Sequence, residues 1–112
     1  MSQDELRETL RQMIAVLQAE RQALAGLDLD AIVGASVDKS KLCGRLDQTG
    51  ALEIDDECRG MLDAAKRLNE VNRQVRNLIA ANVQARLDAL IGQPSLYRAG
   101  GGAAYAYAGG RA

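Results

Sequence analysis

The fold of this chain is decided by residues 56–94, which read DECRGMLDAAKRLNEVNRQVRNLIAANVQARLDALIGQP. Apolar residues recur there at intervals of three and four, which is the period of an amphipathic helix. Asp55 or Asp56 can cap the start, and no strong stop signal occurs before Gly92 and Pro94. The stretch therefore predicts one helix of about 37 residues, roughly 55 Å long at 1.5 Å per residue.

Two shorter helices are predicted upstream. The first begins near Ser2, which stands three residues before Glu5 in the Ser-x-x-Glu spacing of a capping box. The second begins near Asp28 or Asp30, because aspartate is a good helix cap, and it ends at residues 48–50, Gln-Thr-Gly. Both helices carry a seam, meaning a line of positions at alternating spacings of three and four that faces other helices.

The predicted seams run as follows. The first is Leu6, Leu10, Met13, Leu17, Glu20, Leu24 and Leu27; the second is Ile32, Ser36, Lys39, Cys43 and Leu46, with Leu42 beside it; the third is Ile54, Cys58, Met61, Ala65, Leu68, Asn72, Val75 and Ile79, continued by Val83, Leu87 and Leu90.

Short connections make sequential helices antiparallel neighbours, so we predict an all-α fold, a three-helix antiparallel coiled coil or bundle. The first helix has about 24 residues, roughly 36 Å, and the third helix is therefore expected to pass its end near residue 77 or 78. The predicted organisation is a three-helix domain at residues 1–93 and a flexible tail rich in Gly, Ala and Tyr at residues 94–112.

The end of the third helix carries apolar residues that the shorter helices cannot cover. We call this set the late stripe: Leu78, Ile79, Val83, Leu87, Leu90 and Ile91. Each large apolar group is worth about 1.5–3 kcal/mol when fully buried, so a stripe of this size favours a binding surface. It either holds a partner's amphipathic segment or is buried by self-association or by folding back of the chain.

Two polar features interrupt the seams. If the chain turns near residue 28, Glu20 faces Ser36 across the first hairpin and Lys39 lies one turn along. This placement predicts an ion pair between Glu20 and Lys39, the alternative being a solvated seam edge. Asn72 and Asn82 lie on the third seam, where they can bond a partner's backbone or fix the register of the helices. Asn69 and Asn77 fit ordinary surface positions.

Composition argues against catalysis and against a metal site. The chain has no histidine, so the commonest general base and metal ligand is missing. Cys43 and Cys58 lie far apart and form no Cys-x-x-Cys motif. We therefore expect no enzymatic activity, no cofactor, no metal and no small-molecule substrate, and we interpret both cysteines as small core residues.

Charge and hydropathy narrow the class of partner. The 14 basic and 15 acidic residues are interspersed and give a net charge of −1, which does not favour nucleic-acid binding. No apolar run approaches the ~20 residues needed to cross a bilayer, so we expect no membrane insertion. The acidic N-terminal residues do not resemble a signal peptide, and unpaired cysteines suit a reducing compartment, so the expected location is the cytoplasm.

The order and spacing of several short segments resemble the FlgN-like flagellar export chaperones of the hook-associated proteins. The resemblance covers most of residues 5–101. Its pieces are Ala19-Glu20-Arg21-Gln22-Ala23-Leu24, Lys39-Ser40-Lys41-Leu42 with Leu46, then Leu68, Asn72, Leu78-Ile79, Leu87 and Leu90, and Leu96-Tyr97 before the Gly-rich tail.

This resemblance implies a cytoplasmic type III export chaperone. It would bind terminal helical segments of the hook–filament junction proteins, prevent their premature assembly and deliver them to the export gate. The client-binding residues that we expect are Asn72, Val75, Leu78, Ile79, Asn82, Val83, Leu87 and Leu90. Tyr97 corresponds to a tyrosine that docks on the export-gate membrane protein. The alternative is a non-catalytic coiled-coil adaptor that forms homo-oligomers through the late third helix.

Overall fold

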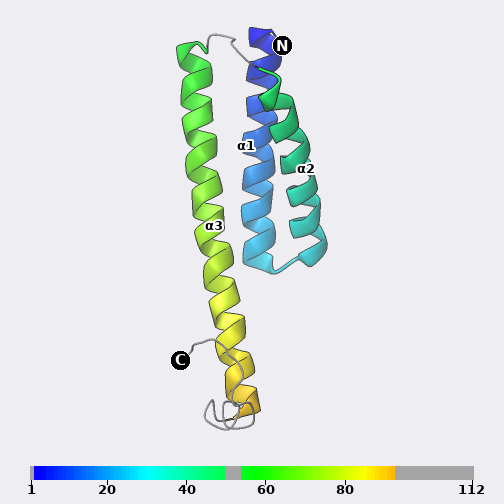
Figure 1. Ribbon diagram of the computed structural model, residues 1–112, viewed down its shortest axis with the longest axis vertical. Helices are drawn as coiled ribbons and strands as arrows, with labels where there is room; N and C mark the ends of the chain where they lie inside the picture. Colours follow the sequence, from blue (N-terminus) through cyan, green and yellow to red (C-terminus); the bar gives the residue numbers. More distant parts are fainter. Residues whose placement is uncertain (1, 50–53, 93–112) are drawn as a thin grey trace. The chain divides into compact units, whose positions relative to one another are not determined.

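The computed structural model describes residues 2–49 and 54–92, and these residues form three helices (Figure 1). The helices are α1 (Gln3–Gly26), α2 (Leu29–Asp47) and α3 (Asp56–Ile91). Helix accounts for 91% of the described residues, and no strand occurs among them. The all-α, three-helix prediction is confirmed.

The helices begin where side chains can satisfy their free backbone N–H groups. The Glu5 backbone donates to Ser2 Oγ (3.1 Å) and the Ser2 backbone donates to Glu5 Oε1 (2.7 Å), which completes the predicted capping box. Asp28 caps α2 by accepting a bond from the backbone N–H three residues further on. At α3, the Cys58 backbone N–H donates to Asp55 Oδ1 (2.8 Å), and this bond lowers the pKa of the Asp55 carboxyl.

Leu27 ends α1 in a left-handed conformation, with φ 53° and ψ 39°. Its N–H donates to Leu24 O (3.2 Å), and the N–H of Asp28 donates to Ala23 O (3.0 Å), the two bonds of a Schellman motif. The side chain of Leu27 is 62% exposed. The prediction that Leu27 belongs to the α1 seam is therefore wrong, because the backbone reverses at that residue before the side chain can reach the core.

The chain divides into two compact units, Met1–Arg76 and Asn77–Ala112. Contacts within the first unit give its topology. Lys39 on α2 reaches Glu20 on α1, while Arg45 reaches Gln12, so α2 runs antiparallel to α1 (Figure 1). The described part of the second unit is residues 77–92, which contain the last turns of α3.

The first part of α3 runs parallel to α1. Arg7 Nε lies 2.9 Å from Glu57 Oε1 near the starts of the two helices. Further along, the Asn72 side chain donates to Leu17 O (2.9 Å). Helix α3 is consequently antiparallel to α2, and a bond from Lys39 Nζ to Asn69 Oδ1 (3.0 Å) joins them.

Two apolar clusters form the core of the first unit. Their buried members come mainly from the leucine-rich seam of α1, and partly buried residues of α2 and α3 pack around them. The clusters are Met13, Leu17, Leu42 and Ala65 in one, and Leu6, Leu10 and Cys58 in the other. Apart from Leu27, every residue of the predicted α1 seam is buried.

The predicted seam of α2 agrees only partly with the residues that α2 buries. Ala35 and Leu42 are buried, whereas the predicted Ser36 and Cys43 are exposed. The spacing allows both choices, and packing selects the one that buries a methyl and an isobutyl group and leaves the hydroxyl in water. The interpretation of Cys43 as a core residue is therefore wrong.

Cys58 is a core residue, as predicted. It is fully buried and unpaired, and burial raises the pKa of its thiol.

Candidate functional site

The late stripe is the largest set of exposed apolar side chains in the described part of α3. Leu78 is 65% exposed and Leu90 is 83% exposed, and Val83, Leu87 and Ile91 are each about half exposed. Ile79 is half-buried. A soluble protein seldom presents so many large apolar groups on one short helical segment unless a partner covers them.

The late stripe continues the buried face of α3. Cys58, Ala65 and Asn72 recur at intervals of seven residues and are buried in the first unit. Ile79 stands seven residues after Asn72, so it falls on nearly the same face of the helix. Helix α3 therefore keeps its apolar face through residues 79–90, while the exposure of that face rises.

Most of the late stripe shares this face, but Leu78 does not. Ile79, Val83, Leu87 and Leu90 follow spacings of four, four and three, which places them along one side of a helix. Leu78 precedes Ile79 by a single residue, about 100° around the helix. It is the member of the late stripe that fits a single binding face least well.

Gly92 ends the helix that carries the stripe. Its φ is 103°, and its N–H donates to Asp88 O (3.1 Å) and to Ala89 O (3.2 Å). Glycine adopts this left-handed conformation without the steric cost that other residues meet. The predicted stop at Gly92 therefore defines where the exposed apolar face ends.

The eight predicted client-binding residues differ in accessibility. Five are exposed: Leu78, Asn82, Val83, Leu87 and Leu90. Val75 and Ile79 are half-buried. Asn72 is fully buried, so of the two roles that its seam position allows, the structure favours the fixing of register over contact with a partner.

Asn72 belongs to a buried polar cluster in the first unit. Its Nδ2 donates to Leu17 O and to Glu20 Oε1, both at 2.9 Å. Lys39 Nζ lies 3.2 Å from both carboxylate oxygens of Glu20, and the Glu20 side chain is 3% exposed. The structure thus brings together the two partners of the predicted ion pair and adds an amide to them.

Two further members of this cluster were not foreseen from the sequence. Asn69, interpreted as a surface residue, accepts a bond from Lys39 Nζ (3.0 Å). Arg76 Nε lies 3.9 Å from Glu20 Oε2 but has no hydrogen-bond partner. The sequence spacing could have identified them, because Asn69, Asn72 and Arg76 are three and four residues apart and therefore share one face of the helix.

The described residues offer no metal-binding cluster. No group of three or more Cys, Asp or Glu side chains that could hold a metal occurs within residues 2–49 and 54–92. None of the three described helices has an apolar stretch long enough to cross a bilayer.

Tyr97 and the tail at 94–112 lie outside the described residues, so the predicted docking role of Tyr97 stays a prediction.

Comparison of the chain with protein-family models, with curated proteins and with solved structures finds no match.

Proposed function

We propose that this protein is a type III export chaperone of the flagellar kind, which holds terminal helical segments of hook-associated proteins before their secretion. The observation that carries the proposal is the late stripe, an apolar helix face that continues the core seam of α3 and is exposed. The similarity of the sequence segments to FlgN-like chaperones supplies the class of client.

The proposed mode of binding is helix against helix. Ile79, Val83, Leu87 and Leu90 form a row at helical spacing, which matches the apolar row of an amphipathic client segment. The favourable free energy of binding comes from burial of apolar surface on both partners. A client held in this way cannot use the same face to assemble with other copies of itself.

A charge placed on this apolar row tests the proposed helix-against-helix binding directly. Leu87→Asp should reduce the affinity for a fluorescent peptide from the terminal helix of a hook-associated protein by at least about a hundredfold, because a buried carboxylate would lack a partner. The binding is measured by fluorescence anisotropy, with circular dichroism to check helix content. Leu87 is half exposed, so the free protein should keep its fold.

Ala85→Asp is the matched control. Ala85 is exposed and stands two residues from Leu87, about 200° around the helix, so the same charge is placed on the other side. Binding by this variant should remain near that of the unchanged protein. Equal binding by both variants would place the client elsewhere, and light scattering that shows a stable oligomer lost on Leu87→Asp would support the homo-oligomeric adaptor.

Delivery to the export gate is proposed to use Tyr97. A tyrosine side chain is large and rigid and its hydroxyl can form a hydrogen bond, which suits a small transient contact. Tyr97→Ala should leave the melting temperature and client affinity nearly unchanged while it slows secretion of the junction proteins. A large fall in melting temperature, or normal secretion, would contradict a docking role.

A further inference from the structure

The outer side of α2 carries a second row of exposed apolar side chains, and this row lies wholly within the first unit. We call it the α2 row: Leu29, Val33 and Val37, which are 74%, 61% and 49% exposed. Spacings of four residues place the three on one side of the helix. Ala35 and Leu42 are the residues that α2 buries, so the α2 row takes no part in the core of the first unit.

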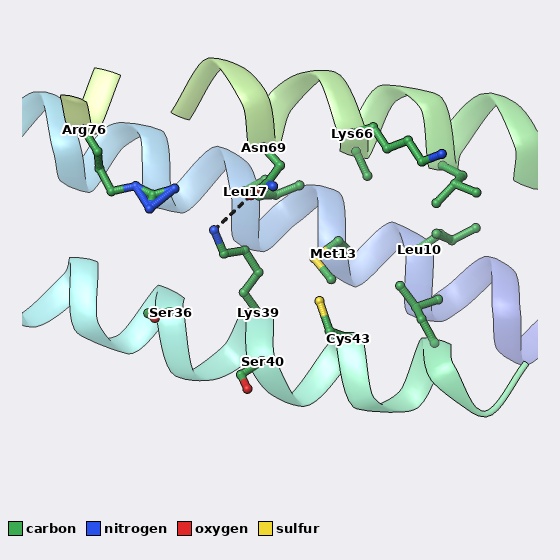
Figure 2. Close-up of a pocket in the computed structure, with 13 residues that line it drawn as sticks. Leu10, Met13, Leu17, Ser36, Lys39, Ser40, Cys43, Lys66, Asn69 and Arg76 are labelled. Carbon is green, nitrogen blue, oxygen red and sulfur yellow. Dashed lines mark hydrogen bonds between the residues drawn. The ribbon is translucent and has the colours of Figure 1, made fainter. Parts of the chain in front are cut away.

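The polar bonds of α2 to the other helices are made away from this row. The side of α2 that faces α1 lines a groove of about 510 Å³ between α2 and α3, and Figure 2 shows Lys39 and Cys43 directed from α2 toward α1. Lys39 bonds there to Glu20 and Asn69. No residue of the α2 row lines the groove, so the two are separate surfaces of one helix.

Two residues of opposite charge border the α2 row. Asp30 and Lys41 are exposed, and neither forms an ion pair with a described residue. Asp30 precedes Val33 by three residues and Lys41 follows it by eight. These spacings place them about 60° and 80° from Val33 in the same sense around the helix. The two charges therefore lie along the same edge of the α2 row, about three turns apart.

This pattern is complementary to itself when two α2 helices run antiparallel. In a two-fold pair, residue i of one copy meets residue j of the other and j meets i, so equivalent edges of the two helices face each other. If Val33 of each copy meets Val37 of the other, the midpoint of the contact lies at Ala35. Asp30 and Lys41 have nearly the same midpoint, so each would lie beside its opposite charge on the other copy.

Other segments of the chain do not match this edge. Residues 93–112 contain no acidic residue that could pair with Lys41. In the last turns of α3, Arg86 and Asp88 stand only two residues apart, which is too close to match charges three turns apart. A surface for an unrelated protein requires no symmetry about one point, so charge complementarity combined with this symmetry selects a second copy as the occupant.

We propose that two copies of this protein associate through the α2 row, with their α2 helices antiparallel. Val33 and Val37 would pack across the two-fold axis, with Leu29 at each end of the contact. Asp30 of each copy would pair with Lys41 of the other. The surface is small and its charges are exposed, so the dissociation constant should be micromolar or weaker. The proposal does not depend on client binding by the late stripe.

Sedimentation equilibrium of the full-length protein from about 1 µM to 1 mM should show a concentration-dependent equilibrium between monomer and dimer. Val33→Asp should raise the dissociation constant at least about tenfold, because it places two carboxylates in the apolar contact. Ala31→Asp is the matched control, since Ala31 is exposed and stands two residues away, about 200° around the helix. Its dissociation constant should stay near that of the unchanged protein. Circular dichroism checks that both variants fold.

The charged edge gives a more specific test. Lys41→Asp should raise the dissociation constant about tenfold, because two attractions become two repulsions, and Asp30→Lys should do the same. The double variant with both changes should return to within about threefold of the unchanged protein, since each pair is restored with its signs exchanged. The two single variants, when mixed, should bind each other more tightly than either binds itself.

Leu87→Asp separates the α2 row from the late stripe, and it should leave this equilibrium unchanged. Loss of the dimer in Leu87→Asp would place the contact on the late stripe and overturn the proposal. A monomer throughout the concentration range would also overturn it, and would leave the α2 row to a different protein. So would equal dissociation constants for Val33→Asp and Ala31→Asp, or a double charge variant as weak as the single ones.

Discussion

At the scale of single residues, Glu20 is the most unusual position, because its carboxylate is buried on the leucine-rich face of α1. Its charge is offset by the ammonium of Lys39 and by the amide of Asn72. A buried ion pair adds little net stability, but the loss of one partner leaves the other charge buried and unsatisfied. The cluster therefore acts mainly to select one alignment of the three helices.

Lys39→Met should lower the free energy of unfolding by about 3 kcal/mol, since it removes the cation nearest to the buried Glu20 carboxylate and leaves only Arg76, at 3.9 Å. In a Glu20→Gln background the same change should cost only about 1 kcal/mol, because a neutral amide needs no counter-charge. Urea unfolding followed by circular dichroism measures both values, with Lys41→Met as the control at an exposed position. Equal costs in the two backgrounds would show that the pair contributes no coupling.

The pair itself was predictable, and its surroundings were not. A turn near residue 28 places Glu20 opposite Ser36 with Lys39 one turn along, which is close enough for the two charged side chains to pair. The part played by Asn72 depends on how α3 is rotated about its own axis. Nothing in the spacing of the polar residues alone determines that rotation.

At the scale of the helices, the residues at which helices begin and end were easier to predict than the face that each helix buries. Ser2, Asp28, Asp55 and Gly92 each satisfy or end the backbone hydrogen bonds of a helix by local geometry, and local geometry is written in short sequence motifs. The face that α2 buries depends on packing against α1. That is why Ser36 and Cys43 were assigned wrongly while the bounds of α2 were close.

Leu27→Gly should stabilise the protein by about 1 kcal/mol, because glycine meets no steric penalty in the left-handed conformation and the exposed leucine loses little packing. Thermal unfolding should therefore shift upward. Leu29→Gly is the control, since Leu29 is 74% exposed but opens α2, where glycine should destabilise. A loss of stability for Leu27→Gly would mean that its side chain contributes packing that its exposure does not suggest.

At the scale of the whole molecule, one helix takes part in both units of the chain. Comparison of helix lengths in the sequence places the end of the paired part of α3 near residue 77 or 78, and the two units divide between Arg76 and Asn77. The apolar face of α3 is buried at Cys58, Ala65 and Asn72 before this division, and after it the face is half-buried at Ile79 and exposed from Val83 onward. The late stripe could be predicted because it follows from helix length and period, whereas the groove between α2 and α3 requires the three-dimensional placement of the helices.

We propose that a client covers residues 77–91. Amide hydrogen exchange of the full-length protein, alone and saturated with the terminal helix of a hook-associated protein, tests this most directly. An exposed helical segment with few tertiary contacts opens at low cost, so its amides should exchange quickly in the free protein and at least tenfold more slowly in the complex. The amides of Leu10 and Leu17, in the α1 core, should change little. Unchanged exchange across residues 77–91 in the saturated complex would contradict client binding by this segment, as would slow exchange in the free protein that depends on its concentration.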